Sequence, residues 1–170
     1  MIVAFAPVSG AHLNPVVTIG DRIRGGRNTA LAVSYVLAQV AGAVLGTVAA
    51  NLLFGLPAVT WSTTARTGGT RWLSEALATF GLVLVVQLVG RHGRPAETAF
   101  AVAAYVGAAI VFTPSTCFAN PAVTLARMLT DTFSGIAPSS VPPFLVAQVV
   151  GALGAVARTV SQPRDAEGRP

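Results

Sequence analysis

Apolar residues are gathered into four long stretches, which polar or glycine-rich segments separate. A helix needs about 20 apolar residues to cross a bilayer, within a range of about 17 to 25. The predicted spans are residues 29–54, 72–89, 98–112 and 144–160. Two further runs, residues 16–23 and 122–129, have helical character but are too short to span. The pattern predicts an all-α polytopic membrane protein with four spans and two half-helices.

Composition supports this class and changes the interpretation of the charge. The 170 residues are 53% hydrophobic and 10% charged, with a mean hydropathy of +0.67, which is too apolar for a soluble domain. All 11 basic residues are arginine. Because they lie between apolar stretches with few aromatic residues beside them, they indicate membrane topology and not nucleic-acid binding. The single cysteine, Cys117, excludes an intrachain disulfide framework.

The arginines also predict an orientation. Eight of the 11 lie in the loops 21–28 and 90–97 and in the segment after residue 157, all on one side of the predicted bilayer. Positive residues concentrate on the cytoplasmic side, so residues 161–170 are predicted to form a polar, disordered cytoplasmic tail of a plasma- or inner-membrane protein. The two half-helices then enter the membrane from opposite faces.

The most specific feature is an Asn-Pro motif that occurs twice. Residues 14–18 (Asn-Pro-Val-Val-Thr) recur as residues 120–124 (Asn-Pro-Ala-Val-Thr), each after a turn of small residues. Asn is a strong helix N-cap, and Pro suits the first helical position. Each motif therefore predicts the start of a half-helix, with the amide NH₂ of Asn14 or Asn120 free to donate elsewhere.

A second repeat pairs residues 35–43 with residues 144–152, which share Ala-Gln-x-x-Gly-Ala. Corresponding elements that enter from opposite sides form an inverted repeat. Small residues at four-residue spacing suit close helix packing in lipid. Gln39 and Gln148 hold the same place in the repeat, and we expect both to hydrogen-bond across helices.

These motifs resemble those of the aquaporin, or major intrinsic protein, family. Residues 9–18 are similar to its first pore loop, residues 120–122 to its second, and residues 75–80 to the signature that opens its second half. The resemblance covers residues 5–160. It implies an aquaporin-like right-handed helical bundle with inverted repeats, six spans, two half-helices that meet in mid-membrane, and usually four subunits with one pore each.

The sequence departs from the family in three places. The first span and nearly all of the second would precede Met1, so we expect the channel domain, residues 1–160, to be incomplete and to give no flux by itself. Val16 replaces the usual Ala of the first motif. Val123 stands where the family has Arg. Arg127 lies four residues farther on, and the sequence does not show that it replaces the family's Arg.

The resemblance implies a passive channel for water or small neutral solutes. Two helix N-termini near the midplane, each with about half a positive charge, would exclude cations. The family's outer filter maps onto Ala108, Cys117 and Val123, a wide and weakly polar opening that favours glycerol-like polyols or arsenite, As(OH)₃. The other expected pore residues are His12 and the two motifs: Asn14, Pro15, Val16, Asn120, Pro121 and Ala122.

Glu75 is the acidic residue that lies inside a predicted span. A carboxylate there is costly unless it is partnered, so we expect it to accept backbone N–H groups of the second loop. One such carboxylate argues against ion coupling, which leaves a secondary transporter as the less favoured alternative, beside an inactive, incomplete channel. No nucleophile-and-base set or metal cluster is visible, so neither an enzyme nor a cofactor is expected. The expected partners are membrane lipid, water or small neutral solutes, and further copies in a homotetramer.

Overall fold

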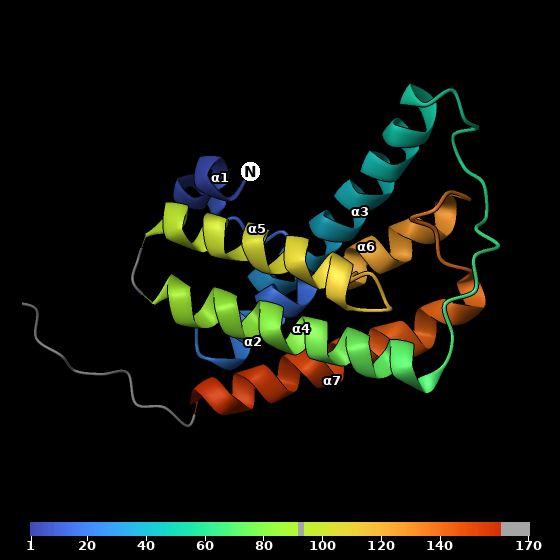
Figure 1. Ribbon diagram of the computed structural model, residues 1–170. Coiled ribbons are helices and arrows are strands. Elements are labelled where there is room, and N and C mark those ends of the chain that lie inside the picture. The colour runs from blue at the N-terminus through green and yellow to red at the C-terminus, as the bar shows by residue number, and fades with distance from the viewer. Residues whose placement is uncertain (92–93, 161–170) are drawn as a thin grey trace, which may run out of the picture.

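The regular structure is helical throughout residues 1–91 and 94–160, which the computed structural model describes (Figure 1). The predicted tail, residues 161–170, lies outside the described residues. The prediction of an all-α membrane protein is confirmed, since four helices are long and apolar enough to cross a bilayer. In chain order the elements are α1 (Ile2–Ser9), α2 (Pro15–Ile23), α3 (Thr29–Leu53), α4 (Gly69–Gly90), α5 (Pro95–Phe112), α6 (Pro121–Ala126), η1 (Arg127–Leu129), η2 (Pro138–Ser140) and α7 (Val141–Val160).

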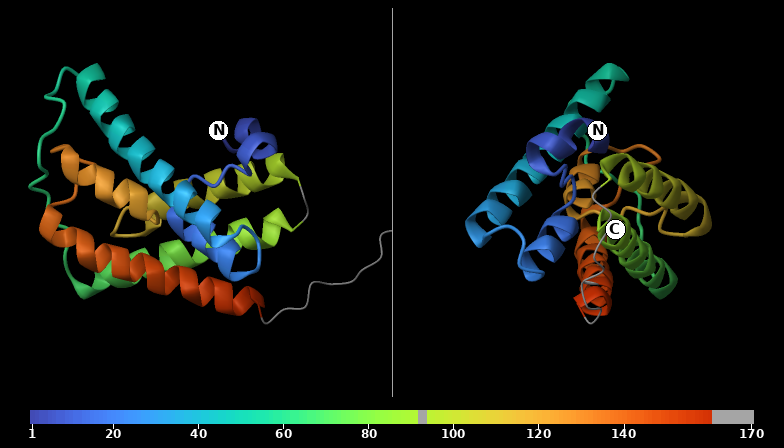
Figure 2. Two further views of the ribbon diagram at one scale, coloured as in Figure 1. Left: turned by 180° about the vertical axis from the view of Figure 1, so that it is seen from behind. Right: turned by 90° about the vertical axis from the view of Figure 1, so that its left-hand side faces the viewer.

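The four long helices are arranged around the two short ones. Helix α4 lies between α5 and α7 and contacts both, while α3 crosses them at an angle (Figure 1). The short helix α1 lies against α5. Two further views show that α2 and α6 lie between α3 and α7 (Figure 2). Each half-helix contacts both α3 and α7, as the inverted repeat predicts.

Each half-helix begins as the Asn-Pro motif predicts. The Asn14 side chain accepts a hydrogen bond from the Val16 backbone N–H at 3.1 Å. The Asn120 side chain accepts from the N–H groups of Ala122 at 3.0 Å and Val123 at 3.4 Å. In both helices proline occupies the first position, where its missing N–H costs nothing.

The core lies where α4, α7 and α2 meet. A Cβ on Gly151 of α7 would collide with the backbone carbonyl of Ala76 on α4, so this position requires glycine. The matching Gly42 of α3 has open space around it, so the close packing expected of the repeat is found in its second copy. The buried residues of this core are Val16, Val83, Ala152, Ala155 and Val156.

Helices α3 and α5 present most of their surface outward. Among the residues of α3 only Ala32 and Asn51 are buried, and in α5 only Ala109. Large apolar side chains such as Leu37 and Val111 are exposed. This surface suits contact with lipid tails or with other apolar helices, in agreement with a membrane location.

Candidate functional site

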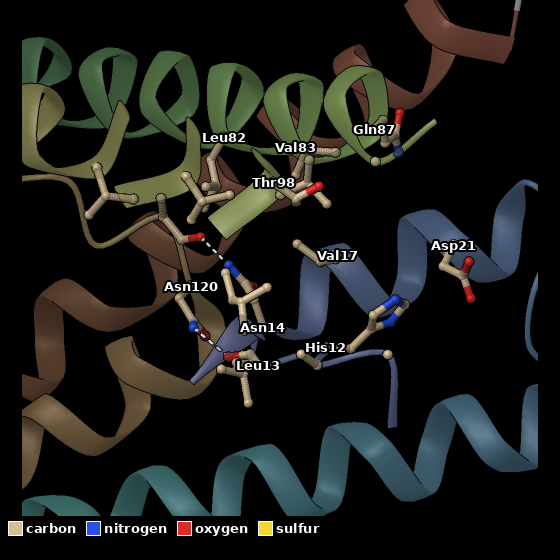
Figure 3. A pocket seen from close by; sticks show the side chains of 18 of the residues that line it. His12, Leu13, Asn14, Val17, Asp21, Leu82, Val83, Gln87, Thr98 and Asn120 are labelled. Carbon is tan, nitrogen blue, oxygen red and sulfur yellow. Dashed lines mark hydrogen bonds between the residues drawn. The ribbon is translucent and has the colours of Figure 1, made fainter. Parts of the chain in front are cut away.

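The two Asn-Pro motifs meet head to head through their asparagines (Figure 3). The Asn14 Nδ2 donates to the Ala119 carbonyl at 2.7 Å, and the Asn120 Nδ2 donates to the Leu13 carbonyl at 3.0 Å. Each amide oxygen meanwhile caps its own helix. An amide NH₂ has two N–H donors. One donor of each asparagine is therefore used to join the two motifs, and one remains.

Both asparagines line a cavity of about 1340 Å³ between α4, α5 and the two motif loops. Of the other predicted pore residues, His12, Cys117 and Val123 also line it. The opposite wall is mainly apolar. It is formed by residues of α4 and α5 such as Leu82, Val83, Val86 and Ile110. The cavity therefore has a polar line along the motifs and an apolar face across from it.

Five predicted pore residues lie outside the lining of this cavity. Val16 and Ala122 are each only 2% exposed, and the methyl groups of Val16 pack into the core beside α7. Ala108 is exposed, whereas Ile110 on the same helix lines the cavity. Residues four apart share a helix face, which places Val102 and Val106 with Ile110 and turns residue 108 away. The remaining residues outside the lining are Pro15 and Pro121.

Glu75 makes the contact that its place in a span led us to expect. It is fully buried, and its carboxylate accepts the backbone N–H of Phe118 at 3.2 Å and of Ala119 at 2.5 Å. The loop that it holds contains three non-glycine residues with positive φ, namely Thr116 (60°), Cys117 (49°) and Ala119 (45°). Such conformations persist only where surrounding contacts impose them. Glu75 supplies two of these contacts.

The glutamines of the second repeat fix the two half-helices in the same way. Gln148 Nε2 donates to Thr124 Oγ1 at 2.7 Å, and Gln39 Nε2 donates to Thr18 Oγ1 at 2.9 Å. Each threonine lies four residues after the motif asparagine. Gln148 also donates to the Glu75 carboxylate at 2.7 Å, which ties α7 to α4. The inverted repeat thus extends to individual hydrogen bonds.

A cluster around Arg27 includes His12 and Asp21, which line the cavity. Arg27 donates to Asp21 at 3.0 Å and to the Ser9 carbonyl at 2.8 Å, and its guanidinium lies 4.8 Å from the Tyr35 ring centre. Burial raises the pKa of Asp21, but the hydrogen bonds from Arg27 outweigh it and leave that pKa lowered. Burial, and then the charge of Arg27, lower the pKa of His12. The imidazole that lines the cavity is therefore neutral near pH 7.

Comparison with known proteins identifies the family. A model of the major intrinsic protein family matches residues 1–113. The aquaglyceroporin AqpS of Rhizobium meliloti is 45% identical over 157 residues, which are 92% of this chain and 67% of AqpS. The chain belongs to the major intrinsic protein family.

Two other relatives show how much of a family member the chain represents. The probable aquaporin AqpM of Archaeoglobus fulgidus is 31% identical over 91% of this chain and 68% of its own length. A glycerol uptake facilitator protein of Streptococcus pneumoniae is 39% identical over 50% of this chain and 42% of its own length. The chain therefore spans about two thirds of the length of AqpS and of AqpM. Members of the family are channels and not enzymes, as the sequence led us to expect.

Sequence analysis missed several residues that shape this major intrinsic protein site. Thr18 and Thr124 were visible as the shared last residue of the two motif copies, and that repetition was the signal. Arg66 carried no such signal, because it lies in a polar loop without a motif. It is only 8% exposed and donates to the carbonyls of Gly135 and Phe133, both at 2.8 Å. Arg66 therefore anchors the loop between η1 and η2.

Proposed function

We propose that the protein is a passive channel for water and small neutral solutes, with the paired asparagine amides as its central solute site. The observation that supports this most is the reciprocal bonding of Asn14 and Asn120, which aligns the N-termini of α2 and α6 beside one cavity. Each terminus carries roughly half a positive charge. A water or hydroxyl oxygen can accept from both free amide N–H groups, whereas a cation meets two positive helix ends.

The lining favours small polyols as the solute class. Val123 and Cys117 put an aliphatic side chain and a thiol where the family has its outer filter, so the opening is wide and weakly polar. The apolar wall opposite the asparagines matches the carbon side of a molecule such as glycerol, and the amides match its hydroxyls. Neutral arsenite, As(OH)₃, fits the same description. The names of the relatives, an aquaglyceroporin and a glycerol uptake facilitator, agree with this proposal.

The acidic residues of the described spans argue against an ion-coupled transporter. Glu75 is committed to two backbone N–H groups and to Gln148, which leaves it no role as a mobile ion ligand. Glu97 lies in the first turn of α5 and is paired with Arg94 at 2.7 Å. Carboxylates that bind coupling ions lie near the midplane of the membrane. Neither Glu75 nor Glu97 supplies an available carboxylate at that depth.

For the whole protein we propose an integral membrane homotetramer with its C-terminus in the cytoplasm. The arginine distribution supports this orientation. The outward apolar surfaces of α3 and α5 supply area both for lipid and for neighbouring copies. Cysteine accessibility in intact cells, with single cysteines placed in the loops 21–28 and 55–68, tests the orientation. Labelling of the first loop from outside the cell would contradict it.

Val123→Arg is expected to reduce glycerol flux at least about tenfold and water flux by less than about threefold. The guanidinium would narrow the opening beside Cys117, and one unfavourable contact of about 1.4 kcal/mol already costs a factor of ten. Stopped-flow light scattering of proteoliposomes measures both rates on the protein expressed from its complete reading frame. Val123→Leu, which adds volume without charge, is the matched control. Equal losses for glycerol and water would place residue 123 outside the filter.

Cys117 is expected to be the site at which a small mercurial blocks flux. It lines the cavity but is only 6% exposed, and burial disfavours the reactive thiolate, so labelling should be slow. Because it is the only cysteine, the labelling stoichiometry should approach one per chain. Cys117→Ser should conduct and resist the reagent. A conducting channel whose Cys117 stays unlabelled would remove this residue from the filter.

A further inference from the structure

The outer end of the cavity carries a guanidinium that neither motif predicts. Arg127 lines the cavity together with Val123 and Cys117. Residues 123 and 127 are four apart at the junction of α6 and η1, so they share a face about one helical turn apart. We propose that Arg127 is the charge-selecting residue of this mouth, which repels cations and donates hydrogen bonds to neutral solutes. This inference rests on the proposed channel function.

The backbone that carries Arg127 is fixed from three sides. All three carbonyls of η1 accept backbone N–H groups from distant loops. Ile136 donates to the carbonyl of Arg127 at 3.3 Å, and residues 60 and 62 donate to the other two carbonyls at 3.1 and 2.9 Å. These bonds fix the backbone of residue 127 beside the cavity, and the contact with Phe118 positions its guanidinium. The position of Arg127 is therefore determined by the fold.

The side chain of Arg127 contacts an aromatic ring of the protein, but this contact leaves its N–H donors unused. Its guanidinium lies 4.3 Å from the ring centre of Phe118, within the range of a cation–π contact. Phe118 is buried and packs edge-on against Phe144 at 5.5 Å. Within the described residues the guanidinium makes no hydrogen bond or ion pair. Its five N–H donors thus remain available to whatever occupies the cavity.

Arg66 shows what a purely structural arginine looks like at the same ring. Its guanidinium lies 4.9 Å from the Phe118 ring centre, but it donates to Gly135, Phe133 and Thr116 and does not line the cavity. The positive charge of Arg66 at the same ring repels that of Arg127 and disfavours a deeper burial of the Arg127 guanidinium. The arrangement directs the charge of Arg127 toward the cavity, where water or solute can solvate it.

A guanidinium at residue 127 selects by charge while Val123 keeps the opening wide. The family position directly after the second motif would place the same group in the constriction and reduce its size. At residue 127, one turn farther along, the positive charge still acts on solutes electrostatically, and the side chain does not narrow the path. Solutes of equal shape and different charge should therefore be separated strongly, and neutral solutes of different size only weakly. Urea and the guanidinium cation are such a pair, since both are planar and similar in size.

The test measures influx of urea and of guanidinium into proteoliposomes, with the protein expressed from its complete reading frame. We expect Arg127→Gln to raise the guanidinium-to-urea ratio at least about tenfold, because a unit charge within one Debye length of the path is removed. Arg127→Lys, which retains the charge, should keep the ratio within about threefold of wild type. Arg71→Gln is the matched control, since it removes an arginine at the start of α4 that does not line the cavity.

The outcomes separate this inference from the function on which it rests. Urea flux with an unchanged ratio in a folded Arg127→Gln protein would overturn the role of Arg127 and leave the channel function standing. Failure of the wild type to pass any neutral solute would contradict the channel function itself. If circular dichroism shows that Arg127→Gln does not fold, Arg127→Met keeps the apolar stem against Phe118. The same rise in the ratio is expected of it, and an unchanged ratio there overturns the inference equally.

Discussion

Replacing Glu75 with leucine is expected to lower the free energy of unfolding by at least about 3 kcal/mol and to abolish flux. The carboxylate accepts the N–H groups of Phe118 and Ala119 and the amide of Gln148, all of them buried. Each buried donor left without a partner costs about 1–3 kcal/mol. The loop with positive φ at residues 116, 117 and 119 would then lose the group that imposes this conformation. Thermal unfolding in detergent and solute flux measure the two effects.

Two further variants show whether the effect belongs to the acceptor oxygens. Glu75→Gln keeps one oxygen and places an NH₂ against a backbone N–H, so we expect a loss of stability between that of wild type and leucine. Glu97→Gln changes the same chemical group in a pair with Arg94 whose side chains are 43% and 73% exposed, and exposed pairs contribute little. A Glu75→Leu protein as stable as Glu97→Gln would show that Glu75 does not hold the loop.

Replacing Asn120 with aspartate is expected to convert a pathway for neutral solutes into one that admits cations. Aspartate still caps α6, because it is as good an N-cap as asparagine. It has no N–H to donate to the Leu13 carbonyl, which lies 3.0 Å from the amide in the native protein. The added negative charge also offsets the two half charges of the helix N-termini. We expect at least about a tenfold fall in glycerol flux and a measurable conductance for monovalent cations.

The chain offers a matched control for this substitution. Asn28 caps α3 by accepting from the Leu31 N–H at 2.9 Å, and it does not line the cavity. Asn28→Asp makes the same chemical change at another helix start, so glycerol flux and ion exclusion should stay within about twofold of wild type. Cation conductance that appears equally in both variants would indicate a general loss of integrity. In that case the charge beside Asn120 would not be the cause.

The local rules of the sequence predicted the framework of the site. Asn followed by Pro specifies a helix start through a cap and a missing N–H, and both are local properties, so α2 and α6 were predictable. The cost of a carboxylate in a span likewise pointed to a partner for Glu75. The meeting of the two motifs was implied by the resemblance to the family, while the inverted repeat predicted that they enter from opposite faces. Such features are encoded within a few residues or in a visible repetition.

The direction of individual side chains was not predictable in the same way. Counting residues back from Asn120 placed Ala108 in the filter, but the rotation of α5 turns Val102, Val106 and Ile110 to the cavity. Val16 is directed into the core by its contact with α7, which no local pattern records. Arg127 depends on loops around residues 60 and 136 that fix η1. These features arise from packing between distant segments.

The most direct measurement of the central claim is glycerol influx into proteoliposomes, recorded together with membrane current, with and without gradients of protons and sodium. The protein expressed from its complete reading frame is compared with Asn120→Ala. A passive channel centred on the paired asparagines should admit glycerol at a rate independent of the ion gradients and without current, and Asn120→Ala should lose at least about tenfold of that rate. Glycerol influx that requires an ion gradient, or that is unchanged in Asn120→Ala, would contradict it.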